Sequence, residues 1–393
     1  MPVDIGKEGG LDHMIAELQA RRDYIAEEEE RYFKGPWPLE AFAKRVGVDP
    51  IEAAAGLAAH GRKLKVAVGS ADERDAALGA IVRNGKRGCV LDLVTFWTAH
   101  RLQALAVVVD TCGAIHITQS VVDRLRERRH RLGEAGTEGV SSATLVDGKF
   151  AIVQTSAEQV ASLRDDMDSA LRWIKDNATI QPLEVSDDLP ALFRESLRKD
   201  RDAIFYSLAL AVQKQLLFVS DDLAIRQAAH AMGAHNCTWL HAAFGVALDA
   251  GLVDFDKFVR WAAELASSGQ NFLSVTGDVI AYAAKLDFEE GTSPGLRTVA
   301  LSGILGGMNA DRQSHADAAT RCLVLLWNDK NARPFRRLVT SQVLRAVTRE
   351  RLNDSREILD YIERRCVRLP DLLEYIEGWR VGHFLASWSQ QRW

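Results

Sequence analysis

The segment LLFVSDDLAIRQAAHAMG, residues 216–233, decides how the middle of the chain is expected to fold. Its first five residues are typical of a buried strand, and Asp221 and Asp222 follow where a short amphipathic helix begins. Acidic residues at a strand end can present oxygen ligands at the carboxyl edge of a parallel sheet. They can also cap the helix that follows them, by accepting hydrogen bonds from its first N–H groups. Other carboxylates at the same edge would favour the ligand role.

Strand and helix patterns alternate around this segment, from residue 86 to residue 255. That alternation predicts an α/β domain with a doubly wound, mostly parallel sheet. A hairpin with Asp147-Gly148 at its turn interrupts the alternation. The expected strands of the sheet are CVLDLVTFW (89–97), AIHIT (114–118), residues 180–185, residues 216–220 and a short strand near Thr238.

The flanks of this domain are expected to be helical, which divides the chain into an N-terminal region 1–85, the domain 86–255 and a C-terminal region 256–393. Residues 37–60 have the outline of a helix-turn-helix. The second of these helices, Ile51 to Ala59, has no Arg, Lys, Asn or Gln to read base edges, so packing or partner contact is the favoured interpretation.

Composition excludes several classes of protein. The 393 residues are 47% hydrophobic and 26% charged, as in an ordinary globular protein. A net charge of −5 means that nucleic-acid binding would have to rely on local basic patches. The start of the chain has no signal-peptide pattern and no apolar run is long enough for a membrane span, so a cytoplasmic protein without a membrane partner is expected. Five scattered cysteines argue against a disulfide framework and a thiolate zinc site: Cys89, Cys112, Cys237, Cys322 and Cys366.

Four acidic positions are expected to meet at one edge of the sheet. Each lies at a strand end or a helix start, and these positions share one edge in a doubly wound fold. Carboxylates brought together repel one another unless a cation compensates them, and an all-oxygen set suits Mg²⁺ or Mn²⁺. Such a site could activate a water for attack on a phosphodiester. The positions are Asp92, Asp123, Asp202 and the pair Asp221/Asp222, with Asp221 favoured over Asp222 as the direct ligand.

The run ALAVVVDTCGAI offers Asp110 as an alternative first carboxylate. Only a few residues separate Asp110 from the strand 114–118, however, and a parallel crossover needs a dozen or more. Asp92 leaves room for a helix between the strands and is therefore preferred.

The order and spacing of these acidic motifs resemble those of the PIN-domain nucleases. The motifs are CVLDLVT with Asp92, ITQSVVDRL with Asp123, KDRDAIFYSLALA with Asp202 and LLFVSDDLAIR with Asp221 and Asp222. The resemblance covers roughly residues 86–255, and the flanks are similar to PIN proteins associated with TPR and GreA/GreB-C-like modules. It departs from the pattern in having Asp123 where Glu is usual, and in the length of residues 133–190, which suggests an inserted hairpin and helix.

The resemblance implies a Mg²⁺- or Mn²⁺-dependent nuclease that cuts RNA, in a toxin or defence setting. Its candidate partners are RNA, single-stranded DNA, a protein that contacts the helical regions and a second copy of the chain. The main alternative is a catalytically inactive PIN-like scaffold that binds protein partners. Side chains that could track phosphates, or form a solvated face with ion pairs instead, are Arg124, Arg128 and Arg131. Arg226 could bind phosphate or orient the carboxylates of the cleft.

Overall fold

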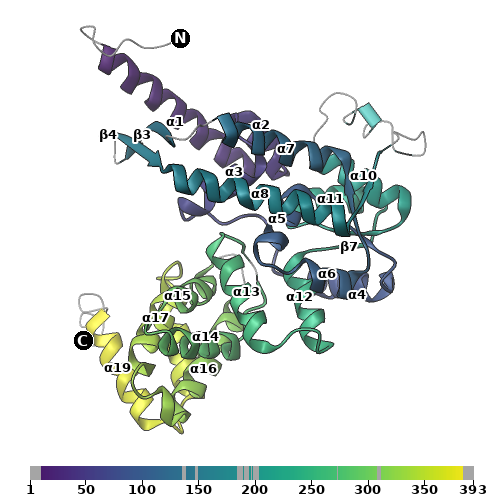
Figure 1. Ribbon diagram of the computed structural model, residues 1–393. Coiled ribbons are helices and arrows are strands. Elements are labelled where there is room, and N and C mark those ends of the chain that lie inside the picture. Colours follow the sequence, from purple (N-terminus) through teal and green to yellow (C-terminus); the bar gives the residue numbers. More distant parts are fainter. Residues whose placement is uncertain are drawn as a thin grey trace. The chain divides into compact units, whose positions relative to one another are not determined.

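The structure, a computed structural model, contains a parallel sheet among helices and a separate set of helices (Figure 1). It describes residues 10–134, 139–146, 149–183, 189, 194–195, 197, 203–271, 273–307 and 311–383. Contacts between residues divide the chain into two compact units. The sheet unit comprises Met1–Gly56 and Ala77–Ala243, and the helical unit comprises Leu57–Ala76 and Phe244–Trp393.

The sheet has five strands, all parallel, in the order β5-β2-β1-β6-β7. The first strand in the chain, β1, is therefore central, and the chain leaves it toward β2 on one side and returns as β6 on the other. The carboxyl ends of β1 and β6 consequently form the switch point of the sheet, where ligands bind in open α/β folds. The strands are β1 (Cys89–Leu91), β2 (Ile115–Thr118), β5 (Thr179–Gln181), β6 (Leu217–Val219) and β7 (Cys237–Thr238).

The expected α/β class and parallel sheet are confirmed, but the strand predicted for residues 89–97 is wrong in its length. It ends at Leu91, and helix α5 begins at Leu93. Asp92 therefore stands at the strand end instead of inside the strand. Asp110 lies within helix α6 (Leu105–Cys112), so the rival run ALAVVVDTC is helical and not a strand.

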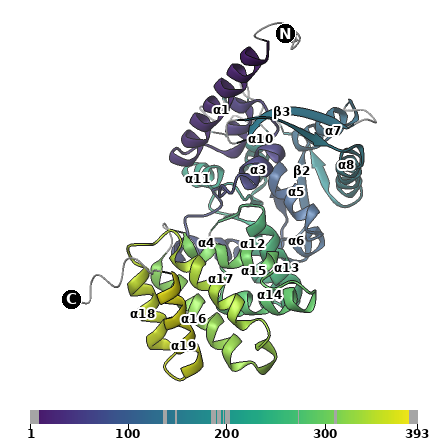
Figure 2. The ribbon, with the colours of Figure 1, turned by 90° about the vertical axis from the view of Figure 1, so that its left-hand side faces the viewer.

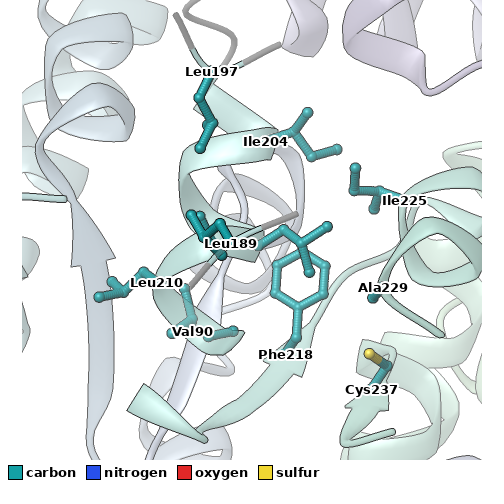
Figure 3. Packing of buried hydrophobic residues seen from close by; sticks show 12 residues of the cluster. Val90, Leu189, Leu197, Ile204, Leu210, Phe218, Ile225, Ala229 and Cys237 are labelled. Carbon is teal, nitrogen blue, oxygen red and sulfur yellow. The ribbon is translucent and has the colours of Figure 1, made fainter. Parts of the chain in front are cut away.

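Helix α10 (Ala203–Lys214) packs against β1, β2 and β6 and so carries much of the core of the sheet unit. Leu208 and Leu210 on α10 lie with Val90 of β1 and Phe218 of β6 in one buried apolar cluster (Figure 3). Each such side chain stabilises the fold by roughly 1.5–3 kcal/mol through removal of apolar surface from water. The buried residues of α10 are Ala203, Ile204, Ser207, Leu208, Ala209, Leu210 and Ala211.

The helices before and between the strands follow the predicted order, and an antiparallel hairpin is inserted after α7. The hairpin strands are β3 (Val140–Val146) and β4 (Lys149–Thr155); the predicted turn residues Asp147 and Gly148 lie outside the described residues. The helices are α1 (Gly10–Lys34), α2 (Leu39–Val46), α3 (Pro50–Ala59), α4 (Ala71–Asn84), α5 (Leu93–Arg101), α6 (Leu105–Cys112), α7 (Gln119–Glu134), α8 (Ala157–Asn177), α10 (Ala203–Lys214), α11 (Leu223–Ala231) and α12 (Leu240–Asp249).

The helical unit contains the series α13–α19, drawn in green to yellow in Figure 2. Packing joins α14 to α16, α13 to α15, and α16 to both α17 and α18. Residues from earlier in the chain join this unit, since Leu64 forms an isolated parallel bridge with Gln270. The helices are α13 (Phe255–Ser267), α14 (Gly277–Glu289), α15 (Leu296–Ser302), α16 (Arg312–Asn328), α17 (Arg336–Thr348), α18 (Ser355–Arg365) and α19 (Pro370–His383), with 3₁₀ turns at Gly303–Gly306 and Lys330–Ala332. Among the described helices of both units, none combines the length and apolar character needed to cross a membrane.

Candidate active site

Asp92 is the first carboxylate of the site and caps helix α5. It directly follows β1 and is 2% exposed. Its Oδ1 accepts a hydrogen bond from the backbone N–H of Thr95 (2.8 Å), and its Oδ2 accepts one from the Thr95 hydroxyl (2.9 Å). The local pattern Asp-Leu-Val-Thr thus places a polar side chain at the third helical position, where it can bind the cap.

Asp92 faces the end of β6 because of the strand register. Leu91 pairs with Val219, so the next residues along the two parallel strands, Asp92 and Ser220, stand at the same edge. The Thr95 hydroxyl oxygen also accepts the backbone N–H of Asp221 at 2.8 Å. One threonine therefore connects the two strand ends.

Asp221 and Asp222 are both buried and turn toward different helix starts. Asp221 Oδ1 accepts the backbone N–H of Leu240, the first residue of α12, at 3.0 Å. Asp222 caps α11, and its Oδ1 accepts the N–H groups of Ala224 (2.9 Å) and Ile225 (3.3 Å). Its Oδ2 accepts the N–H of Leu39, the first residue of α2, at 2.6 Å. The capping role expected from the sequence is thus present for Asp222.

Burial dominates the electrostatics of two of these carboxylates. It raises the pKa of Asp92, although hydrogen bonds from Ser220 and Thr95 act in the opposite direction. Burial also raises the pKa of Asp222 to about 6; the Leu39 N–H opposes this rise and the nearby Asp92 charge adds to it. Within the described part of the chain, the hydrogen bonds to Asp92 and Asp222 come from N–H and hydroxyl groups. The charges of this pair are therefore incompletely compensated.

Asp123, another predicted ligand, does not join this arrangement in the described structure. Asp123 lies on α7 with its side chain 60% exposed, and it accepts hydrogen bonds from Gln119 (2.8 Å) and Arg126 (3.5 Å) of the same helix. Asp202 lies outside the described residues. The prediction that these two residues bind metal stays a prediction.

The four arginines predicted to contact nucleic acid all have interaction partners within the protein. Arg124 pairs with Glu127, while Arg128 and Arg131 both pair with Asp49 at the start of α3. Arg226 is buried; it donates to the Ser220 carbonyl at 2.6 Å and lies 4.7 Å from the centre of the Trp239 ring. Arg226 thus supports the β6 end from within, and the RNA-contact role of all four arginines stays a prediction.

An all-oxygen set of buried carboxylates fits Mg²⁺ or Mn²⁺ in its chemistry. Within the described residues, however, no group of three or more His, Cys, Asp or Glu side chains is placed to hold a metal ion. The described carboxylates therefore make up part of a cation site at most, and Asp202 is not among them.

Sequence reasoning missed the groups that hold these carboxylates from elsewhere in the fold. They are the Leu39 N–H, which Asp222 accepts, and the Leu240 N–H, which Asp221 accepts. The carboxylate of Glu40, which binds the start of α10, was missed as well. The Asp-Leu-Val-Thr pattern could have identified Thr95, because its bonds to Asp92 span three residues. The Leu39 contact joins residues 183 positions apart, for which the sequence carries no local signal.

Comparison with known proteins identifies one domain. Residues 90–231 match the family described as the PIN domain associated with the TPR-GreAB-C-PIN system, which covers over a third of the 393-residue chain. No curated protein and no solved structure matches the chain.

Proposed function

Residues 90–231 form a PIN domain of the type associated with the TPR-GreAB-C-PIN system, and on that premise we propose that the chain is a metal-dependent nuclease that hydrolyses RNA. The observation that carries the proposal is the pair of strand ends at the switch point of the sheet. There, Asp92 and Asp222 are buried, close enough for the Asp92 charge to raise the pKa of Asp222, and paired in the described structure with neutral donors. A divalent cation would compensate this charge.

In this proposal, Asp92 and Asp221 would hold Mg²⁺ or Mn²⁺ together with Asp123 and Asp202. Asp222 would either bind the ion directly or support its ligands by holding the start of α11. When bound, the ion supplies a water of lowered pKa as nucleophile and stabilises charge on the phosphate. The Thr95 hydroxyl orients Asp92 and fixes the backbone at Asp221. Arg226 holds the Ser220 carbonyl, so the β6 end keeps its direction.

The test compares wild-type protein with Asp92→Asn and Asp221→Asn on mixed RNA and single-stranded DNA, with Mn²⁺ and with EDTA. We expect Mn²⁺-dependent cleavage of RNA that falls at least about a hundredfold in both variants, because metal ligation contributes several kcal/mol to the rate. The matched control is Asp165→Asn, an exposed carboxylate on α8 of the same unit. Full activity in both site variants would contradict the assignment.

The alternative of an inactive scaffold is favoured by one specific observation. Both oxygens of Asp92 and of Asp222 accept hydrogen bonds from donors at helix starts, which stabilise negative charge without a cation. If wild-type protein neither cleaves RNA nor binds Mn²⁺ in a titration, the scaffold with protein partners is the better account.

A toxin or defence role is proposed as the biological setting of the nuclease. Induced expression in a bacterial host should then slow growth, while Asp92→Asn should not. Equal growth of the two strains at equal protein levels would argue against this setting.

A further inference from the structure

The start of helix α2 lies against the carboxylate edge, although α2 precedes the segment that matches the PIN family. Leu39, its first residue, donates its backbone N–H to Asp222 Oδ2 at 2.6 Å. Leu39 is 5% exposed, so this bond is formed away from water. A charge-assisted hydrogen bond in such surroundings is stronger than one between neutral groups.

The next residue, Glu40, binds the start of a second helix of the sheet unit. Its Oε1 accepts the N–H of Ala203 at 2.9 Å and its Oε2 accepts the N–H of Ile204 at 2.7 Å. These are the first two residues of α10, so Glu40 meets two N–H groups that lack partners within their own helix. The Glu40 side chain is itself buried, with 6% exposed. Glu40 thus caps the start of α10 from 163 residues away.

Two consecutive residues of α2 therefore hold the starts of two helices that border the site, α11 through Asp222 and α10 through Glu40. A third contact, from Asp49 to Arg128 and Arg131 of α7, anchors the α2–α3 pair at another point. Groups that orient the ligands of a metal site by hydrogen bonding typically influence metal affinity or activity by about 10–100-fold.

Resting on the proposed nuclease function, we propose that the Leu39 N–H and the Glu40 carboxylate are positioning groups of the active site. They fix Asp222 and the start of α10 in the arrangement that the reaction requires. The catalytic unit of this chain therefore extends beyond the PIN segment and includes α2.

The Leu39 N–H can be removed without removing the helix. Leu39 is the first helical position, which tolerates proline because its N–H has no partner within the helix. The preceding residue, Pro38, already has the extended backbone (φ −71°, ψ 154°) that a following proline requires. Leu39→Pro therefore deletes the donor to Asp222, and Leu39→Ala serves as its baseline, since it shortens the same side chain but keeps the N–H.

Glu40→Gln tests the second group, with Glu28→Gln as its matched control. Glu28 is also a buried carboxylate of the N-terminal helices, but it pairs with Arg31 and Arg45 instead of a helix start at the site. Thermal unfolding of all four variants separates lost stability from lost positioning. Mn²⁺ titration and RNA cleavage with Mn²⁺ are the functional readouts.

We expect Leu39→Pro to reduce cleavage or Mn²⁺ affinity about tenfold relative to Leu39→Ala, and Glu40→Gln to do so relative to Glu28→Gln. If cleavage and Mn²⁺ affinity of Leu39→Pro and Glu40→Gln equal those of Leu39→Ala and Glu28→Gln, the proposal is overturned. Increased cleavage also overturns it, because α2 would then restrict access to the site instead of positioning it. If the wild-type protein neither cleaves RNA nor binds Mn²⁺, the nuclease function is refuted and this inference with it. If the wild-type protein is active and the variants match their baselines, only this inference is refuted.

Discussion

Asp222 in the sheet unit and Asp287 in the helical unit are both buried aspartates that bind N–H groups at a helix start. Asp287, on α14, accepts the N–H (2.9 Å) and the hydroxyl (2.6 Å) of Thr298 in α15, and it also accepts a hydrogen bond from Arg297 at 3.1 Å. The described donors to Asp222 are backbone N–H groups alone. Asp287 thus pairs with a cationic side chain, whereas the donors to Asp222 in the described part of the chain are neutral.

This difference has a physical basis. A buried charge is costly unless it is paired, and the guanidinium of Arg297 supplies the pairing for Asp287. The described donors to Asp222 are neutral, and burial, with the nearby Asp92 charge adding to it, raises the pKa of Asp222 to about 6. Perturbed carboxylates of this kind are typical of functional sites, which is why the sheet edge and not the α14–α15 contact is the candidate site.

The largest effect is expected for Asp287→Ala. It would leave Arg297 without its buried partner and the Thr298 N–H unsatisfied, and should lower the free energy of unfolding of the helical unit by about 3 kcal/mol. Asp256→Ala, which breaks the half-exposed pair with Arg260, is the control and should cost under about 1 kcal/mol. Chemical denaturation measures both changes. RNA cleavage per folded molecule should be unchanged in both; a loss in Asp287→Ala alone would break the distinction between the two sites.

A smaller effect is expected from pH. Since the pKa of Asp222 is about 6 in the folded protein and about 3.9 in the unfolded chain, the folded state binds the extra proton at pH 5. Stability contributed by this proton should be lost as the pH rises from 5 to 7, by about 1–2 kcal/mol. Denaturation in EDTA should show this fall of the unfolding free energy with pH in the wild type. The fall should be smaller in Asp222→Asn, whose amide oxygen can still cap α11. An equal pH dependence of the unfolding free energy in the two proteins would mean that the Asp222 charge is compensated.

The smallest effect concerns Mn²⁺ as a stabiliser. At three times its dissociation constant, a ligand that binds only the folded state adds about 0.8 kcal/mol. Hydrogen exchange should show this protection at α5 and α11 of the sheet unit and none at α14 and α15. Asp92→Asn should abolish it. Protection spread equally over both units would instead indicate nonspecific binding.

Much of the fold could be predicted because its signals are local. The strand patterns around Val90 and Phe218 and the helix periods of α10 and α13–α19 depend on residues a few positions apart. The prediction of a strand through residues 89–97 was wrong because Leu93, Phe96 and Trp97 are apolar on a fully buried helix face, which periodicity cannot distinguish from a buried strand.

The sequence by itself determined that acidic residues follow the first and fourth strands of the sheet and that each can cap its own helix. These bonds, Asp92 to Thr95 and Asp222 to Ala224, span two or three residues. The tertiary structure alone decided what else holds these carboxylates. The Leu39 N–H, which Asp222 accepts, and the Leu240 N–H, which the neighbouring Asp221 accepts, come from the starts of other helices, and only packing brings them to the sheet edge. A buried charge takes its donors from whatever is nearest in space, and distance along the chain does not limit that choice.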